Sequence, residues 1–305
     1  MREAFSSALI RLAMADPKIL LLTGDHGYAL FDEFRKHCSD QYVNAGIAEQ
    51  NMVGMAAGLA RVGFRPFVYG LAAFVPVRTV EQIKLDIAHD DLPVVLLGDG
   101  AGFVYSHLGT SHQSTEDIAC TRAIPGLQVL SPADRFEMAG CMDYAYSSKA
   151  PIYLRMGKSD RGDVHVGQLS NLQPGRLLKV NDGYADKPAL IATGSMVKTA
   201  ADIGNKYGLN VWSAPMLKPL RTEDVCAAAK TSVGIVTLEE HSILGGLGAA
   251  VAEILSEHQP TRILRIGVPD QFSAHCGTHN YLLHEHGLDY ETIHTKVLNF
   301  CKVMA

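Results

Sequence analysis

A single carboxylate, Glu49, stands near the head of an otherwise small and apolar segment, NAGIAEQNMVGMAAGLARVG at residues 44–63. In one interpretation it occupies the first turn of a helix, where a carboxylate meets the positive end of the helix dipole. A second interpretation starts from the residues that follow it, because they cover every face of the expected helix with apolar side chains and so indicate a buried helix. They are Met52, Val53, Met55, Ala56, Ala57, Leu59 and Ala60. Burial disfavours the charged form of a carboxyl group unless a partner compensates, so Glu49 is a candidate for proton chemistry.

Gly54 and Gly58 lie four residues apart on the same expected helix, with alanines between them. Positions four apart share one helix face, and glycines there let another helix approach closely. The pattern indicates a helix at a tight interface.

Two histidines, His107 and His112, lie in the loop-like stretch YSHLGTSHQSTED at residues 105–117. Loops at the C-terminal ends of parallel strands are where α/β sheets bind ligands, so both are candidates for substrate contact or proton transfer. The alternative is that they are solvated loop side chains. A second histidine-rich stretch has no carboxylate pattern to complete a coordination shell, so we predict no zinc site there. It contains His275, Cys276, His279, His284, His286 and His294.

The tripeptide GDG at residues 98–100 follows an apolar strand and matches the start of the magnesium and diphosphate motif of thiamine-dependent enzymes. That motif needs an asparagine roughly 25–30 residues later, as a further oxygen ligand for octahedral magnesium. No asparagine lies between Asn51 and Asn171. We therefore predict that Asp99 is a turn residue at a strand end, and that any diphosphate cofactor needs another chain to hold its diphosphate.

Helix-period segments alternate with short apolar strands along the first half of the chain, which predicts a parallel sheet covered on both faces. A polar, Gly-rich stretch and a second, smaller alternation follow. We predict an α/β protein with two doubly wound domains, at 1–165 and 186–305, joined by a linker at 166–185. The expected helices lie near 2–15, 47–62, 76–89, 133–146, 196–206, 222–229 and 246–257.

Composition excludes several functional classes. The chain has 305 residues, 47% of them hydrophobic, and a net charge of -5, which argues against nucleic-acid binding. No apolar run reaches membrane-spanning length and no cleavable signal is evident. Scattered cysteines without a CxxC pair indicate free thiols in a reducing compartment, so we expect a cytoplasmic protein.

Four blocks of sequence carry a family resemblance. GIAEQNMVGMAAGLA, PFVYGLAAFVPVRTVEQIKLDIA, GTSHQSTEDIACTRAIPGLQVLSPAD and TLEEHSILGGLGAAVAE resemble successive blocks of transketolase and deoxyxylulose-5-phosphate synthase, in family order. The resemblance covers only the pyrimidine-binding and C-terminal domains. It implies the C-terminal subunit of a split, two-gene transketolase, with thiamine diphosphate as cofactor.

The resemblance assigns Glu49 to the glutamate that contacts the pyrimidine ring of thiamine diphosphate. A carboxyl group hydrogen-bonded to ring nitrogen N1′ stabilises the imino tautomer, whose neighbouring nitrogen removes the thiazolium C2 proton. Phe74 would supply a face on which the pyrimidine stacks, with Leu71 and Val77 completing an apolar pocket. Asp25 is the remaining cofactor contact that the resemblance implies.

The same resemblance implies the substrate contacts. His112 would face the reacting carbons and Arg155 would bind an anionic group. Transketolases typically carry an aspartate four residues before the loop histidine, and Leu108 stands there in this sequence. A leucine side chain cannot accept a hydrogen bond from a hydroxyl of the donor sugar. This predicts a modified sugar as the substrate that donates the ketol unit, unless His107 makes that contact instead. The positions of the phosphate-contacting histidine and serine fall on Gly100 and Ala29.

We therefore expect a catalytic subunit that transfers a two-carbon ketol unit from a ketose to an aldose. It would assemble as α2β2 with a separate diphosphate-binding subunit that also holds most of the Mg2+ coordination. A beta subunit of a 2-oxoacid dehydrogenase and a synthase that uses pyruvate are the enzymatic alternatives. A non-catalytic regulatory subunit that keeps the fold is the alternative of another class.

Overall fold

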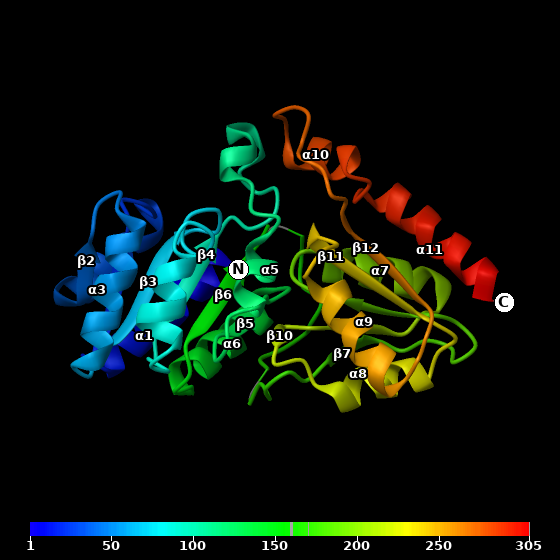
Figure 1. The fold of residues 1–305 in the computed structure, drawn as a ribbon, viewed down its shortest axis with the longest axis horizontal. Helices are drawn as coiled ribbons and strands as arrows, with labels where there is room; N and C mark the ends of the chain where they lie inside the picture. The colour runs from blue at the N-terminus through cyan, green and yellow to red at the C-terminus, as the bar shows by residue number, and fades with distance from the viewer. Residues whose placement is uncertain (159–160, 170, 305) are drawn as a thin grey trace.

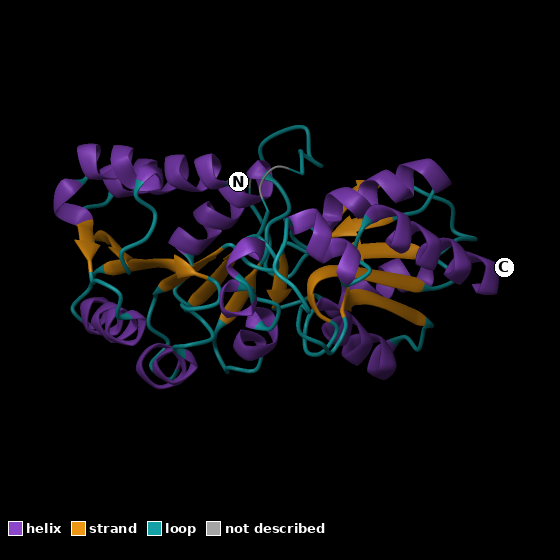
Figure 2. Ribbon diagram, turned by 90° about the horizontal axis from the view of Figure 1, so that it is seen from above, coloured by secondary structure: helices purple, strands orange, loops and turns teal. Residues whose placement is uncertain are grey.

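The computed structural model describes residues 1–158, 161–169 and 171–304. Two sheets lie side by side, each with helices on both faces (Figure 2). Short, fully buried strands alternate with helices along the chain, and such strands need cover on both sides. The predicted fold class, two doubly wound α/β domains, is confirmed.

The first sheet has seven strands in the order β10-β5-β6-β4-β3-β1-β2. Every neighbouring pair is parallel except β10 with β5. The strands are β1 (Ile19–Thr23), β2 (Tyr42–Asn44), β3 (Arg65–Leu71), β4 (Val95–Asp99), β5 (Gln128–Leu130), β6 (Ile152–Met156) and β10 (Met216–Lys218). The chain passes from β1 to β2 on one side and then returns to β3 on the other. This order creates a topological switch point at the carboxyl ends of β1 and β3, where such sheets bind ligands.

Helices α1, α2 and α6 cover one face of this sheet, and α3, the π-helical η3 and α5 cover the other. Their bounds are α1 (Arg2–Ala15), α2 (Asp32–His37), α3 (Glu49–Arg61), η3 (Ile83–Ala88), α5 (Asp117–Arg122) and α6 (Arg135–Ser147). Short turns connect them, namely η1 (Ala29–Phe31), η2 (Ser39–Gln41), α4 (Val80–Gln82), η4 (Ser106–Leu108) and η5 (Thr110–His112).

The second sheet has five strands in the order β12-β11-β8-β9-β7, all parallel except β7 with β9. They are β7 (Leu178–Asn181), β8 (Ala189–Ala192), β9 (Val211–Ser213), β11 (Ile235–Ser242) and β12 (Ile263–Val268). On one face lie α7 (Met196–Tyr207) and α11 (Tyr290–Met304), and on the other α8 (Thr222–Lys230) and α9 (Leu247–His258). The short α10 (His279–Glu285) precedes α11.

The two domains share a strand and part of their core. β10 belongs by sequence to the second half, yet Met216 pairs with Leu130 in the first sheet. One buried apolar cluster runs from α3 and η3 through α5 into α8 and α9. The segment 166–185, predicted as a linker, includes β7 of the second sheet. Because the core is continuous, the domains are held as one packed body.

Candidate functional site

The residues of interest lie at the carboxyl ends of three neighbouring parallel strands. Asp25 follows β1, Glu49 opens the helix after β2, and Phe74 lies in the turn after β3. The topology therefore brings together side chains that are up to fifty residues apart in sequence. This is the ligand-binding edge of the sheet.

Glu49 is the first residue of α3 and its side chain is 4% exposed. The predicted burial is confirmed, but the carboxylate is not alone, since Arg78 Nη1 donates to its Oε2 at 3.1 Å. Glu49 Oε1 is buried and has no hydrogen-bond partner among the described residues. A buried acceptor without a donor is costly, so Oε1 is a contact point that a ligand with an N–H group can satisfy.

Phe74 is the centre of the cluster. The guanidinium carbon of Arg78 lies 4.1 Å from the centroid of its ring, and the imidazole of His112 meets the ring edge-on at 5.2 Å between centroids. Leu71, the last residue of β3, is buried, and Val77 is half-buried in the same turn. Arg78 contacts both Glu49 and Phe74, and Phe74 contacts His112. The three residues that the resemblance assigned to one site are thus joined by a series of contacts.

Asp25 adopts a left-handed backbone conformation, with φ of 62°, a strained geometry that is frequent at functional sites. Its Oδ1 accepts hydrogen bonds from the Tyr28 hydroxyl at 2.6 Å and from Asn44 Nδ2 at 3.3 Å. The bond from Tyr28 is the main cause that lowers the pKa of Asp25. Asp25 is thus fixed beside the end of β2.

His26, which the sequence pattern did not single out, also lies beside Phe74. Its ring lies 6.3 Å from that of Phe74, and its Nε2 is buried without a hydrogen-bond partner in the described part of the chain. Its position directly after a strand end, in the tetrapeptide GDHG at 24–27, is the signal that could have found it.

The two histidines of the 105–112 loop go to different places. Gly102 and Ser114 close the base of the loop with two backbone hydrogen bonds, of 2.7 and 3.0 Å. Above them the loop projects from the molecule near α10 (Figure 1). His112 in η5 turns toward Phe74, whereas His107 in η4 lines a separate cavity. Leu108 between them is 56% exposed.

That cavity, of about 560 Å³, lies between the two domains and is rich in cationic and polar side chains. It is lined by Val104, Ser106, His107, Lys158, Arg161, Thr278, His279 and Asn280. Arg161 Nη2 is buried and has no hydrogen-bond partner among the residues that the structure describes. A guanidinium with an unsatisfied donor favours an anionic ligand.

Glu240 fixes the position of one cavity residue. The Glu240 carboxylate, at the end of β11, bonds His279 Nε2 at 2.9 Å and accepts from the Ser195 hydroxyl at 2.6 Å and the Phe103 amide at 2.8 Å. Although burial opposes it, these hydrogen bonds lower the pKa of Glu240 to about 2. Glu240 thus ties the first domain to the wall of the cavity.

Arg155, which the family resemblance assigned to an anionic substrate group, is 2% exposed in the free chain. It donates to Asp117 Oδ2 at 2.8 Å and to the Glu240 carbonyl at 2.8 Å. Arg155 links β6 to the second domain through these contacts.

Asp99, of the GDG tripeptide, is a buried hub at the end of β4. Its carboxylate accepts hydrogen bonds from Arg2 at 2.5 Å and from the hydroxyls of Tyr69 at 2.9 Å and Tyr105 at 2.7 Å. Asp99 therefore holds α1 against the sheet.

Within the described ranges, no three His, Cys, Asp or Glu side chains are grouped as a metal ion would need. The histidine-rich stretch at 275–294 is included in this statement.

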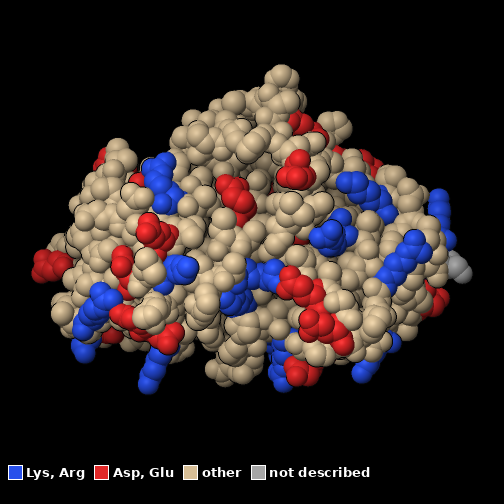
Figure 3. All heavy atoms as spheres, viewed as in Figure 1, with Lys and Arg blue, Asp and Glu red and all other residues tan. Residues whose placement is uncertain are grey.

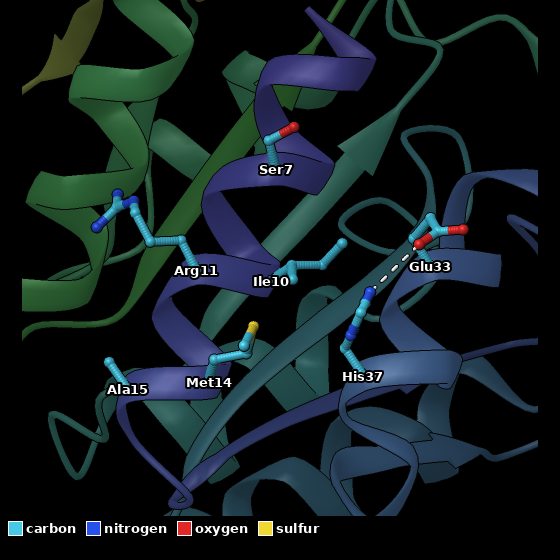
Figure 4. A pocket seen from close by; sticks show the side chains of 7 residues that line it. All are labelled: Ser7, Ile10, Arg11, Met14, Ala15, Glu33 and His37. Carbon is cyan, nitrogen blue, oxygen red and sulfur yellow. Dashed lines mark ion pairs between the residues drawn. The ribbon is translucent and has the colours of Figure 1, made fainter.

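A larger cavity, of about 660 Å³, lies on the outer side of α1 and α2 (Figure 4). It contains none of the predicted site residues, and its ion pair joins His37 Nε2 to Glu33 Oε2 at 3.3 Å.

Acidic and basic side chains are interspersed on the face drawn in Figure 3. None of the described helices is long and apolar enough to cross a membrane.

Comparison with known families gives two matches. A sequence model described as the transketolase pyrimidine binding domain matches residues 1–162, and one described as the transketolase C-terminal domain matches residues 180–293. Together they cover most of the chain. Glu49, Phe74 and His112 all lie in the part that matches the pyrimidine binding domain.

Several proteins are similar over nearly their whole length. The chain is 35% identical to an apulose-4-phosphate transketolase subunit of Phocaeicola vulgatus, over 99% of this chain and 97% of that protein. It is 30% identical to a 6-deoxy-6-sulfo-D-fructose transketolase subunit of a Clostridium species, over 96% and 92%. A solved structure described as a split gene transketolase, in an inactive beta4 tetramer, superposes with a TM-score of 0.88 at 33% identity and covers 98% of each chain.

Proposed function

The chain belongs to the transketolase family, as a subunit of the split-gene kind, and from this premise we propose that it supplies the pyrimidine-binding half of the active site. It is a transferase subunit that moves a two-carbon ketol unit from a ketose donor to an aldose acceptor. The observation that carries the proposal is the series of contacts from Glu49 through Arg78 and Phe74 to His112, together with the buried, unsatisfied Oε1 of Glu49.

The residues of this cluster fit an aminopyrimidine. Glu49 Oε1 is a buried acceptor aimed at no protein donor among the described residues, and Phe74 offers a flat ring between Leu71 and Val77. Thiamine diphosphate, when bound, supplies the carbanion that takes up and releases the two-carbon unit. Glu49 would bind ring nitrogen N1′ and hold the proton there. Asp25 and His26 would line the same pocket from the end of β1.

His112 is proposed to meet the substrate at its reacting carbons. It stands edge-on to Phe74, and its Nδ1 lies 2.9 Å from Ser111 Oγ, which sets the orientation of the ring. An imidazole held in this way can donate or accept a proton at a substrate oxygen. The remainder of the 105–112 loop would cover the site from above.

A second chain is needed for the cofactor's charged end. The only GDG tripeptide carries Asp99, whose carboxylate is already held by Arg2, Tyr69 and Tyr105. We propose that a diphosphate-binding subunit holds Mg2+ and the diphosphate, in an α2β2 assembly. The six cysteines, all free thiols, support a reducing, cytoplasmic location.

Self-association is proposed to involve α3. Gly58 on this helix is exposed, and a Cβ built at Gly54 or Gly58 meets no atom within 4 Å. Ile47 and Val62, at the two ends of the helix, are 76% and 73% exposed. In the single chain the helix is therefore buried on one side only, which differs from the expectation of burial all round. A second copy of this chain would cover the bare side.

Gly58→Leu tests this surface directly. The folded monomer has room for the side chain, and leucine favours a helix over glycine by up to about 1 kcal/mol, so the free chain should keep its stability. The assembly should dissociate, because the new side chain fills the space that another helix needs. Sedimentation velocity measures this, with thermal melting as the folding control. An unchanged oligomer would mean that this face of α3 is not the interface.

The substrate is proposed to be a sugar with a modified donor end and an anionic group. Leu108 cannot accept a hydrogen bond from a donor hydroxyl, and the cavity that contains the buried, unsatisfied guanidinium nitrogen of Arg161 is lined by its neighbour His107. The named relatives act on apulose 4-phosphate and 6-deoxy-6-sulfo-D-fructose. Both sugars depart from ordinary pentose and hexose phosphates, and each carries an anionic group.

A donor panel with the reconstituted complex checks this specificity. Branched, deoxy and sulfonated ketoses should be turned over in preference to xylulose 5-phosphate. Arg161→Met should raise KM for anionic donors about 10-fold or more, since one charged hydrogen bond contributes about 1.5–3 kcal/mol, and should leave kcat nearly unchanged. Efficient and stereoselective use of xylulose 5-phosphate above every other donor would contradict the proposal.

A further inference from the structure

Arg78 makes the two contacts that the proposed function assigns to the aminopyrimidine. Its Nη1 donates to Glu49 Oε2 at 3.1 Å, and its guanidinium carbon lies 4.1 Å from the centroid of the Phe74 ring. One flat group therefore both stacks on the phenylalanine and bonds the buried carboxylate.

A guanidinium and an aminopyrimidine resemble each other chemically. Both are planar and delocalised, both contain an N–C–N unit, and both present N–H donors at the edge and a π-face on each side. A site that selects for a flat group with edge donors accepts either. A pyrimidine ring on this face of Phe74 would need the space that Arg78 takes up.

We propose that Arg78 is a built-in surrogate for the aminopyrimidine, which holds the pocket of the free subunit in shape until the cofactor displaces it. The inference rests on the proposed function of this pocket. Arg78 also provides the buried carboxylate of Glu49 with a donor before the cofactor arrives, since a buried carboxylate with no donor at all would destabilise the fold.

The position of Arg78 allows it to leave. Its side chain is 46% exposed, and the next residue, Thr79, is fully buried. The backbone at this point is thus anchored, while the guanidinium borders on solvent. Release requires a change of side-chain rotamer and no movement of the turn. Cofactor binding must then compete with the contacts of Arg78. The apparent affinity for the cofactor is the intrinsic affinity multiplied by the fraction of sites from which Arg78 is absent.

The test is thiamine diphosphate binding to the complex of this chain with its partner subunit, with Mg2+ present, measured by titration calorimetry. Arg78→Met should bind the cofactor about 3- to 10-fold more tightly, because it removes one half-exposed ion pair and one cation–π contact from the competing state. Arg78→Gln, which keeps a hydrogen bond to Glu49 but no charge, should fall between Arg78→Met and wild type. The free Arg78→Met chain should melt at a lower temperature than wild type.

Arg11→Met is the matched control. Arg11 on α1 is 58% exposed and pairs with Asp143 on α6, on the face of the sheet opposite α3, so its loss should leave cofactor affinity unchanged. The sign of the effect is diagnostic, because a residue with a merely structural role weakens binding when it is removed. Unchanged or weaker binding in Arg78→Met would overturn the surrogate role, even if Glu49→Gln still abolishes turnover. A wild-type complex that binds no thiamine diphosphate would overturn this inference and the proposed function together.

Discussion

Glu49→Gln is expected to lower turnover of the reconstituted complex by about 100- to 10,000-fold, the usual contribution of a general acid–base group. The substitution keeps the shape of the side chain and one oxygen that can accept from Arg78, so folding and assembly should persist. It removes the acidic proton, and with it the means to hold a proton at the pyrimidine nitrogen. Steady-state kinetics with saturating cofactor measures the loss.

Two controls separate chemistry from structure in this experiment. The variant should sediment with its partner like wild type and should melt within a few degrees of it. Arg11→Met, at an exposed ion pair with Asp143 on the other face of the sheet, should retain full turnover. If Glu49→Gln keeps more than about a tenth of the wild-type rate, another group activates the cofactor and the role of Glu49 is wrong.

The isolated chain is expected to show no transketolase turnover and to bind thiamine diphosphate only weakly. In the free chain Arg78 occupies the proposed pyrimidine pocket, and the carboxylate of Asp99, in the only GDG tripeptide, is held by Arg2, Tyr69 and Tyr105. The most highly charged part of the cofactor therefore lacks its site until a second chain supplies one. Addition of a diphosphate-binding subunit should restore both binding and turnover.

Titration calorimetry with Mg2+ checks the binding half of this expectation, and a coupled turnover assay checks the other. Arg2→Lys is a useful companion variant, because it removes one of the two hydrogen bonds from Arg2 to Asp99 and keeps the positive charge. The isolated Arg2→Lys chain should still show no turnover, because the partner subunit is proposed to supply the remaining ligands of Mg2+ and the diphosphate. Micromolar or tighter binding by the isolated chain would contradict the two-subunit proposal.

Local sequence determined much of this protein. Continuous apolar runs such as LPVVLLG at 92–98 predicted a covered parallel sheet, because such a run needs burial on both faces. An apolar helix headed by Glu49 predicted a buried carboxylate, and the structure confirms it. Short or half-exposed elements such as β2 were not predicted, since three residues carry no periodic signal.

Tertiary structure decided which charges meet. Arg78 lies 29 positions from Glu49, and nothing in its own neighbourhood marks it as a partner, so sequence suggested a lone carboxylate where the fold makes a pair. Arg155 stands at the correct strand end, but the packing of the second domain buries it against Asp117 and the Glu240 carbonyl. Sequence by itself determined the elements and the residue types at their ends, because hydrophobic periodicity and strand termini are local properties. The partners of each charge were decided by the order of the strands and by β10 crossing into the first sheet, because contact across the fold depends on where distant segments are brought in space.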